Sequence, residues 1–126
     1  MPVRVLLVDD QQPFRLAARD VIALSPGFIL VGEADSGEVA VELAAGLLPD
    51  LALMDINLPG IDGVEAARRI REMSPETMFV FVSTYARADY EPGLNETGAA
   101  FVPKAEFSPK RLARAWSTAL KLAGLG

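Results

Sequence analysis

The chain has 126 residues, 51% of them hydrophobic, and a formal net charge of −5 at pH 7. This length supports one domain with its own core, the hydrophobic content argues against disorder, and the negative charge argues against nucleic-acid binding by this domain. The absence of cysteine and histidine excludes disulfides, thiolate or imidazole metal sites, Ser-His-Asp catalysis and a role as a phosphohistidine donor.

The sequence contains no obvious membrane or export segment. No apolar run approaches the roughly 20 residues that a membrane-spanning helix needs. The first residues, Met1 to Arg4, lead directly into a strand pattern rather than into a signal peptide. We therefore expect a cytoplasmic protein that does not interact with the membrane.

Five short apolar runs are predicted to be strands, over residues 3–8, 28–32, 51–54, 78–82 and 99–102. Nearly continuous apolar runs are typical of strands that are covered on both faces. The third run is the clearest, because it ends at Asp55 and the Pro59-Gly60 turn follows shortly afterwards.

Helical patterns separate these strands and are predicted over residues 13–24, 38–47, 64–73 and 109–124. Ser108 is expected to cap the last of them. Leu24, Val39 and Met73 are among the residues that the helical spacing turns toward the core.

Residues 86–97 occupy the place of one more helix, but Pro92-Gly93 lies in their middle. An interior Pro costs roughly 3 kcal/mol and Gly roughly 1 kcal/mol relative to Ala. We expect a short, broken or mobile element there.

The alternation of strands and helices predicts an α/β fold with a parallel sheet covered on both faces. The expected arrangement is a flavodoxin-like, doubly wound (βα)5 fold with strand order 2-1-3-4-5 and right-handed crossovers. Ligands bind at the carboxyl ends of the strands in such sheets. Asp9, Asp10 and Asp55 should meet there, and Ser83 and Lys104 follow the fourth and fifth strands at the same edge.

This combination of residues predicts phosphoryl-transfer chemistry. Carboxylates that converge at one edge repel one another and are costly to bury unpaired. A hard divalent cation, magnesium by preference, would offset them. Lys104 would add a second positive charge and Ser83 a hydroxyl donor, while Asp55 would attack phosphorus.

Each residue also has a simpler interpretation by itself. Asp55 could be an ordinary loop acid, and Asp9-Asp10 could stabilise the N-terminus of the first helix. Ser83 could bond to backbone and Lys104 could be solvated. Their joint position at strand ends favours a site, whereas the cluster of Lys110, Arg111 and Arg114 is interpreted as the solvated face of the last helix.

The chain resembles the receiver domains of bacterial two-component response regulators over essentially its whole length. The matching segments are residues 7–10 (LVDD), 54–63 (MDINLPGIDG), 82–83 (VS) and 98–104 (GAAFVPK). Residues 30–34 (LVGEA) and the Lys104-Ala105 pair look closer to regulators with a LuxR-type helix-turn-helix output. We expect residues 1–126 to form a single receiver domain, with no output domain among them.

The resemblance implies roles for the acidic residues. Asp55 would be the phosphoacceptor, with a sensor histidine kinase as the donor. Asp10, Asp55 and the backbone carbonyl of Asn57 would bind Mg²⁺ (or Mn²⁺) directly, and Asp9 would act through water.

The resemblance also implies a switch. Ser83 and Lys104 would contact the phosphoryl group, and Thr84 and Tyr85 would border it. Phe101 matches an aromatic position that moves inward when the family switches, although it could also be a packed strand residue.

The implied function is a phosphorylation-activated signalling switch that regulates transcription through an output domain or partner protein, and that pairs with a second copy when phosphorylated. It would catalyse its own phosphotransfer and dephosphorylation without turning over an external substrate. Two alternatives stay open. One is a phosphorylation-independent interaction module, which the weak helix favours. The other is a phosphatase-like hydrolase, against which Asn57 argues because no acid stands two residues after Asp55.

Overall fold

The computed structural model describes residues 1–84 and 100–125, which form a sheet with helices on both of its faces. The helix predicted over residues 86–97 therefore lies outside the described residues. The elements, in chain order, are β1 (Val3–Val8), α1 (Gln12–Ala23), β2 (Phe28–Ala34), α2 (Gly37–Leu47), β3 (Leu51–Asp55), α3 (Gly63–Met73), β4 (Met78–Ser83), β5 (Ala100–Pro103), the short 3-10 helix η2 (Lys104–Glu106) and α5 (Pro109–Leu122).

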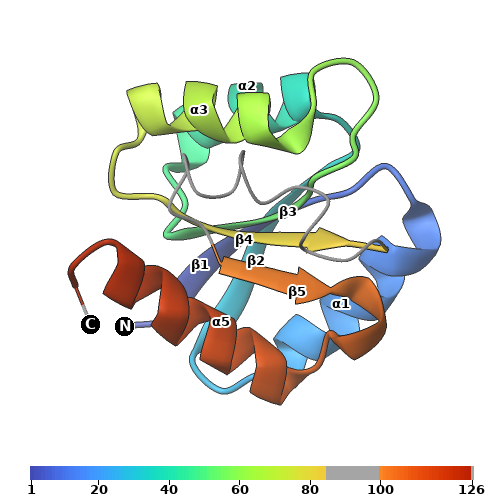
Figure 1. The fold of residues 1–126 in the computed structure, drawn as a ribbon, viewed down its shortest axis with the longest axis vertical. Coiled ribbons are helices and arrows are strands. Elements are labelled where there is room, and N and C mark those ends of the chain that lie inside the picture. Colours follow the sequence, from blue (N-terminus) through green and yellow to red (C-terminus); the bar gives the residue numbers. More distant parts are fainter. Residues whose placement is uncertain (85–99, 126) are drawn as a thin grey trace.

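The five strands form one parallel sheet in the order β2-β1-β3-β4-β5. Helices α2 and α3 cover one face, and α1 and α5 cover the other (Figure 1). This arrangement confirms the predicted flavodoxin-like fold and strand order. Every residue of the central strand β3 is buried, which explains its continuous apolar sequence up to Asp55.

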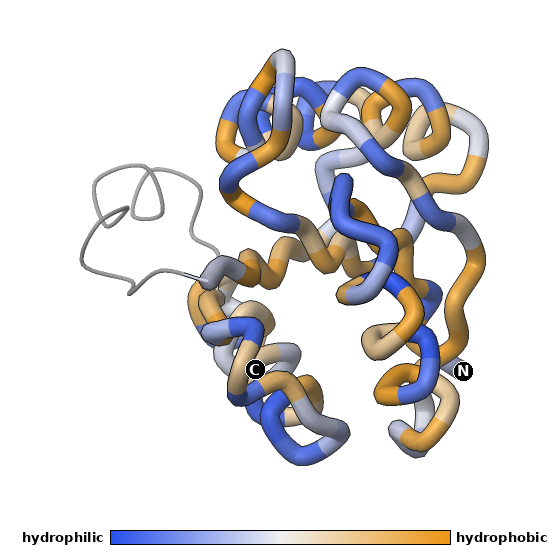
Figure 2. Tube along the Cα trace, turned by 90° about the vertical axis from the view of Figure 1, so that its right-hand side faces the viewer, coloured by the Kyte–Doolittle hydropathy of each residue, from blue (hydrophilic) through white to orange (hydrophobic). Residues whose placement is uncertain are grey.

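A hydrophobic core lies on each face of the sheet. Because successive strand residues point to opposite faces, Leu6 and Met54 join the core under α2 and α3, whereas Leu7 and Leu53 join the core under α1 and α5. Figure 2 shows hydrophobic stretches through the centre of the molecule and alternating hydropathy along the helices. The amphipathic helices are thus held by burial of one face. None of the helices within the described ranges has the length and apolar character that crossing a bilayer demands.

Three of the helices in the described ranges begin at a side-chain cap. Ser36, Asp62 and Ser108 each accept a hydrogen bond from the backbone N–H three residues later, at distances of 3.1, 2.8 and 3.1 Å. Such caps satisfy N–H groups that have no partner inside the helix. The cap at Ser108 confirms the start predicted for the last helix.

Three large apolar residues expected to face the core are instead exposed. Leu24, Val39 and Met73 have exposed fractions of 74%, 36% and 41%. Leu24 is the residue that caps the C-terminus of α1, so the helical period no longer fixes its direction. Val39 and Met73 lie in the first and last turns of their helices.

Gly63 allows α3 to start directly against the end of β3. Its N–H donates to the carbonyl of Ile56 at 3.1 Å. A Cβ atom at position 63 would lie 2.4 Å from the carbonyl oxygen of Asp55, which is backbone and cannot easily move. The close approach therefore requires glycine and fixes the backbone just after Asp55.

We predict that Gly63→Ala lowers the free energy of unfolding by about 1–3 kcal/mol, the usual range for overpacking. Gly46→Ala is the matched control, because nothing lies within 4 Å of a Cβ added there. In α2 this control should be neutral or stabilising by up to about 1 kcal/mol, since Ala is the better helix former. Urea denaturation measures the free energy of unfolding of both variants. Equal changes in the two variants would contradict the packing explanation.

Candidate functional site

The register of the sheet collects the predicted site residues at one edge. Asp55 is the last residue of β3, and Ser83 at the end of β4 pairs with Pro103 of β5. Asp9 and Lys104 follow β1 and β5 directly. Because all the strands are parallel, these side chains share the carboxyl edge of the sheet.

Three carboxylates converge at this edge. Asp9, Asp10 and Asp55 each offer an oxygen, and these oxygens all lie within 4.8 Å of one another. Asp9 and Asp55 are buried, with exposed fractions of 0% and 4%, whereas Asp10 is exposed. Oxygen ligands at this spacing suit a hard divalent cation.

Lys104 reaches into the cluster from the end of β5. Its Nζ atom lies 2.7 Å from Asp9 Oδ2 and 3.0 Å from Asp55 Oδ2, and it donates to Gln11 Oε1 at 3.3 Å. Only 9% of the lysine side chain is exposed. One ammonium group cannot neutralise three carboxylates, so the cluster retains an excess of negative charge.

Backbone groups orient the two buried carboxylates in the same way. The N–H of Gln11 donates to Asp9 Oδ1 at 2.8 Å, and the N–H of Asn57 donates to Asp55 Oδ1 at 2.9 Å. In each of these turns the Asp side chain accepts a hydrogen bond from the backbone N–H two residues later. In both residues Oδ1 is held by backbone, and Oδ2 faces Lys104.

Burial and neighbouring charges shift the pKa values of Asp9 and Lys104. Burial raises the pKa of Asp9 above its ordinary value and the charge of Asp55 adds to this, although Lys104 and the Gln11 N–H act in the opposite direction. Burial by itself would lower the pKa of Lys104, but Asp9 and Asp55 raise it above its ordinary value. Asp9 Oδ2 is held by its ion pair with Lys104 Nζ at 2.7 Å.

Gln11, Phe14 and Arg15 contact the site but were missed from sequence. Arg15 donates to the backbone carbonyl of Asp9 at 2.7 Å and lies 3.6 Å from Glu33, so it supports the loop after β1. The position of Gln11 directly after Asp9-Asp10 was an available signal. Phe14 fits the apolar stripe of α1, and the sequence carries no signal that its ring meets Lys104.

The remaining predicted residues occupy different environments. Ser83 is fully buried at the strand end, whereas Thr84 and Asn57 are exposed. Tyr85 lies outside the described residues. The structure therefore places Ser83, Thr84 and Asn57 around the carboxyl edge without testing their predicted roles.

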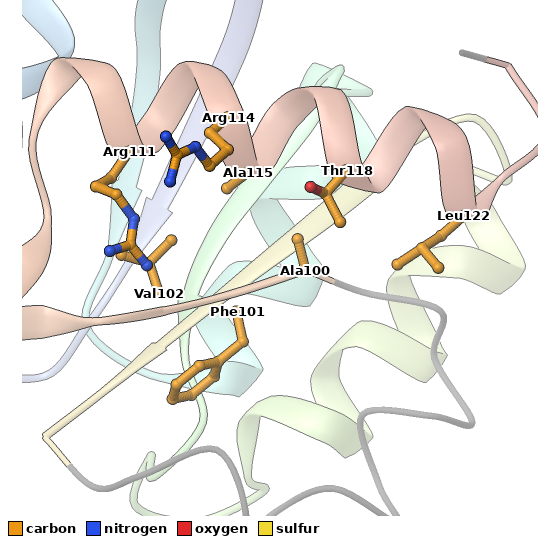
Figure 3. A pocket seen from close by; sticks show the side chains of 8 residues that line it. All are labelled: Ala100, Phe101, Val102, Arg111, Arg114, Ala115, Thr118 and Leu122. Atoms are coloured by element: carbon orange, nitrogen blue, oxygen red, sulfur yellow. The ribbon is translucent and has the colours of Figure 1, made fainter.

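Phe101 lies on β5, half-buried. Figure 3 shows its ring pointing away from the α5 side chains, whereas Ala100 and Val102 point toward α5. The ring packs against the core on the α2 and α3 face. In this conformation Phe101 is a packed strand residue, and its role as a moving switch residue stays a prediction.

Comparisons with known proteins agree on one family for this chain. A family model described as "Response regulator receiver domain" matches residues 5–116. The transcriptional regulatory protein DegU of Brevibacillus brevis is 35% identical over 97 residues, which cover 77% of this chain and 41% of DegU. A protein-glutamate methylesterase/protein-glutamine glutaminase of Alkalilimnicola ehrlichii is 40% identical over 114 residues, which cover 90% of this chain and 28% of that protein.

The fold has close structural neighbours. The crystal structure of a LuxR-family two-component response regulator from an Aurantimonas species superposes with a TM-score of 0.84 at 30% identity, covering 98% of this chain and 87% of that chain. The chain spans less than half the length of the two curated relatives described above. The similarity to those relatives therefore concerns one domain of each.

We predict that Asp9→Asn stabilises the metal-free protein at pH 7, raising the melting temperature by roughly 2–6 °C, which corresponds to about 1 kcal/mol. A carboxyl group whose folded pKa is raised contributes stability that is present below its ordinary pKa of 3.8 and is lost as the pH rises through the folded pKa. Asn at position 9 does not ionise, so this loss of stability does not occur. Its amide oxygen can still accept the hydrogen bond from the Gln11 N–H. The gain should shrink as the pH falls toward 4.

Thermal unfolding in the presence of a chelator between pH 4 and pH 8 measures this difference. Asp10→Asn is the matched control, because that carboxylate is exposed and the same substitution should change stability less. A lower melting temperature for Asp9→Asn at pH 7 would contradict the prediction.

Proposed function

The chain belongs to the family of response regulator receiver domains, and on this premise we propose that Asp55 is the phosphoacceptor of a two-component signalling switch. The observation that carries the proposal is the position of Asp55 Oδ2, which lies 3.0 Å from Lys104 Nζ beside two further carboxylates. A nucleophilic oxygen next to a buried ammonium is suited to attack a phosphoryl group, whose negative oxygens the ammonium attracts.

The residues at this edge fit a magnesium (or manganese) ion. Asp10 and Asp55 would bind it directly together with the backbone carbonyl of Asn57, and Asp9 would act through water. The fit rests on the excess negative charge and on the spacing of the three carboxylates, whose oxygens all lie within 4.8 Å of one another. When bound, the ion would withdraw charge from the phosphoryl oxygens and so help the attack.

The step itself is carried by side chains of this domain. Asp55 Oδ2 attacks phosphorus while the phosphorus–nitrogen bond to the donor histidine breaks, and an aspartyl phosphate forms. We assign Oδ2 as the nucleophile because the Asn57 N–H holds Oδ1. Lys104 donates to one phosphoryl oxygen and Ser83 to another, which stabilises the charge on the transferred group.

Phosphorylation would then change the surface of the domain. The modification adds about −1.5 to −2 charges and strong hydrogen-bond acceptors at the carboxyl edge. Ser83 would move toward the phosphoryl group, and the space it leaves would admit Phe101. This shifts the population between two conformations and repacks the face formed by β5 and α5.

The partners follow from the chemistry and from the relatives. The phosphodonor is a sensor histidine kinase, and the domain works in the cytoplasm without turning over an external substrate. We place its output in transcription, because DegU is a transcriptional regulatory protein, and expect pairing with a second copy on phosphorylation. The likeness to a methylesterase makes an enzymatic output the second candidate.

We predict that acetyl phosphate and Mg²⁺ add one phosphoryl group to the wild-type protein and none to Asp55→Asn, as measured by intact mass. Lys104→Gln should react about 10²-fold more slowly, the usual effect of removing one charge-stabilising donor. No adduct on wild type, where Mg²⁺ binding is demonstrated, would favour a phosphorylation-independent interaction module. Repeated turnover of aryl or sugar phosphates would favour a hydrolase.

We also predict that Mg²⁺ raises the melting temperature of wild type and not that of Asp10→Asn. A ligand that binds only the folded state adds about 2.7 kcal/mol of stability at 100 times its Kd. Asp20→Asn is the matched control, since Asp20 is an exposed acid on α1 outside the cluster and its loss should preserve the shift. Equal shifts in all three proteins would mean that the ion binds elsewhere.

A further inference from the structure

Lys104 also lies against an aromatic ring. Its Nζ atom is 4.8 Å from the ring centroid of Phe14, in the first turn of α1. A lysine ammonium within about 6 Å of such a centroid is attracted by the negative face of the ring. The Phe14 ring in turn contacts Phe107, with centroids 5.8 Å apart and planes inclined by 48°. Phe107 follows η2 closely, so the ring bridges α1 and the segment that carries Lys104.

The ring differs in kind from the other partners of the ammonium. Within the described part of the chain, three oxygens contact Lys104 Nζ, and two of them belong to Asp9 and Asp55. Both carboxylates are also candidates for the metal site, and a divalent cation would draw their charge away from the ammonium. The ring is not a metal ligand, so its hold on Lys104 persists when the carboxylates are engaged.

We propose that Phe14 is a positioning residue that keeps the Lys104 ammonium beside Asp55 while the carboxylates bind the metal. This inference rests on the proposed role of Lys104 in phosphoryl transfer. Phe14 touches neither the metal ligands nor the phosphoryl group in this scheme, and it acts through Lys104 alone. Without the ring, the ammonium would swing toward solvent when the cation arrives, and fewer domains would be ready to react.

A purely structural role for Phe14 is the competing explanation, because the half-buried ring also packs against the core under α1 and α5. The two roles differ in what they require. Packing needs an apolar side chain of similar size, which leucine supplies, whereas attraction of the ammonium needs a ring. Phe14→Leu therefore keeps part of the packing and removes the attraction of the ammonium, whereas Phe14→Tyr keeps both.

The kinetic test measures phosphorylation by acetyl phosphate and Mg²⁺ in these variants. Phe14→Leu should react about 3- to 10-fold more slowly, within the range for loss of a partly desolvated cation–π contact, and Phe14→Tyr within about 2-fold of wild type. In the Lys104→Gln background Phe14→Leu should have no further effect. An equal loss in that background would overturn the proposal, because the ring would then act independently of Lys104.

Phe28→Leu is the matched control. Phe28 is another half-buried aromatic residue, paired edge-to-face with Trp116 at 6.4 Å, and it lies on β2 away from Lys104. It should lose comparable packing and keep the wild-type rate. A loss of rate as large as that of Phe14→Leu would assign the effect to stability and overturn the proposal.

A nuclear magnetic resonance measurement separates this inference from the proposed function. The ring current of Phe14 should shift the Lys104 Hε resonances upfield with and without Mg²⁺. The shift should persist in Phe14→Tyr and disappear in Phe14→Leu. Its loss on Mg²⁺ binding to wild type would overturn the inference. If the shift persists but Asp55 is never phosphorylated, the proposed function fails, and with it the positioning role.

Discussion

The carboxyl edge of the sheet depends on one ion-pair cluster, in which the ammonium of Lys104 lies between Asp9 and Asp55. Parallel strands bring their carboxyl ends to a common edge, and here that brings like charges together. Burial makes such charges costly unless they are paired. The lysine therefore both permits the carboxylates to be buried and leaves their combined charge incompletely neutralised.

This partial neutralisation lowers the stability of the metal-free fold but leaves negative charge that can bind a cation. A neutral residue in place of Asp9 would relieve repulsion, yet it would remove a carboxylate that a cation can use. Marginal stability at active sites is common, because groups arranged for chemistry are seldom arranged for the lowest free energy of the metal-free fold. Glycine at position 63 fits the same pattern, since it gives up helix propensity so that α3 can start against the Asp55 carbonyl.

The sequence was sufficient for the sheet order and for which acids converge. The order is that of the flavodoxin-like fold indicated by the alternation of strands and helices, and the convergence follows from the polarity of parallel sheets. The sequence did not predict side-chain direction correctly where a helix ends. Leu24 fits a helical stripe but stands at a helix cap, and it is exposed. The contact of Phe14 with Lys104 joins residues from opposite ends of the chain, and no local pattern encodes it.

That distance along the chain has a consequence for when the site comes into existence. Lys104 contacts Gln11 across 93 positions and Asp55 across 49, so the cluster closes only after the last strand has joined the sheet. Synthesis delivers the acids first and the lysine last. A nascent chain therefore carries these acids before their internal counter-charge has been made, and the complete site forms as a late step of maturation, after the rest of the sheet.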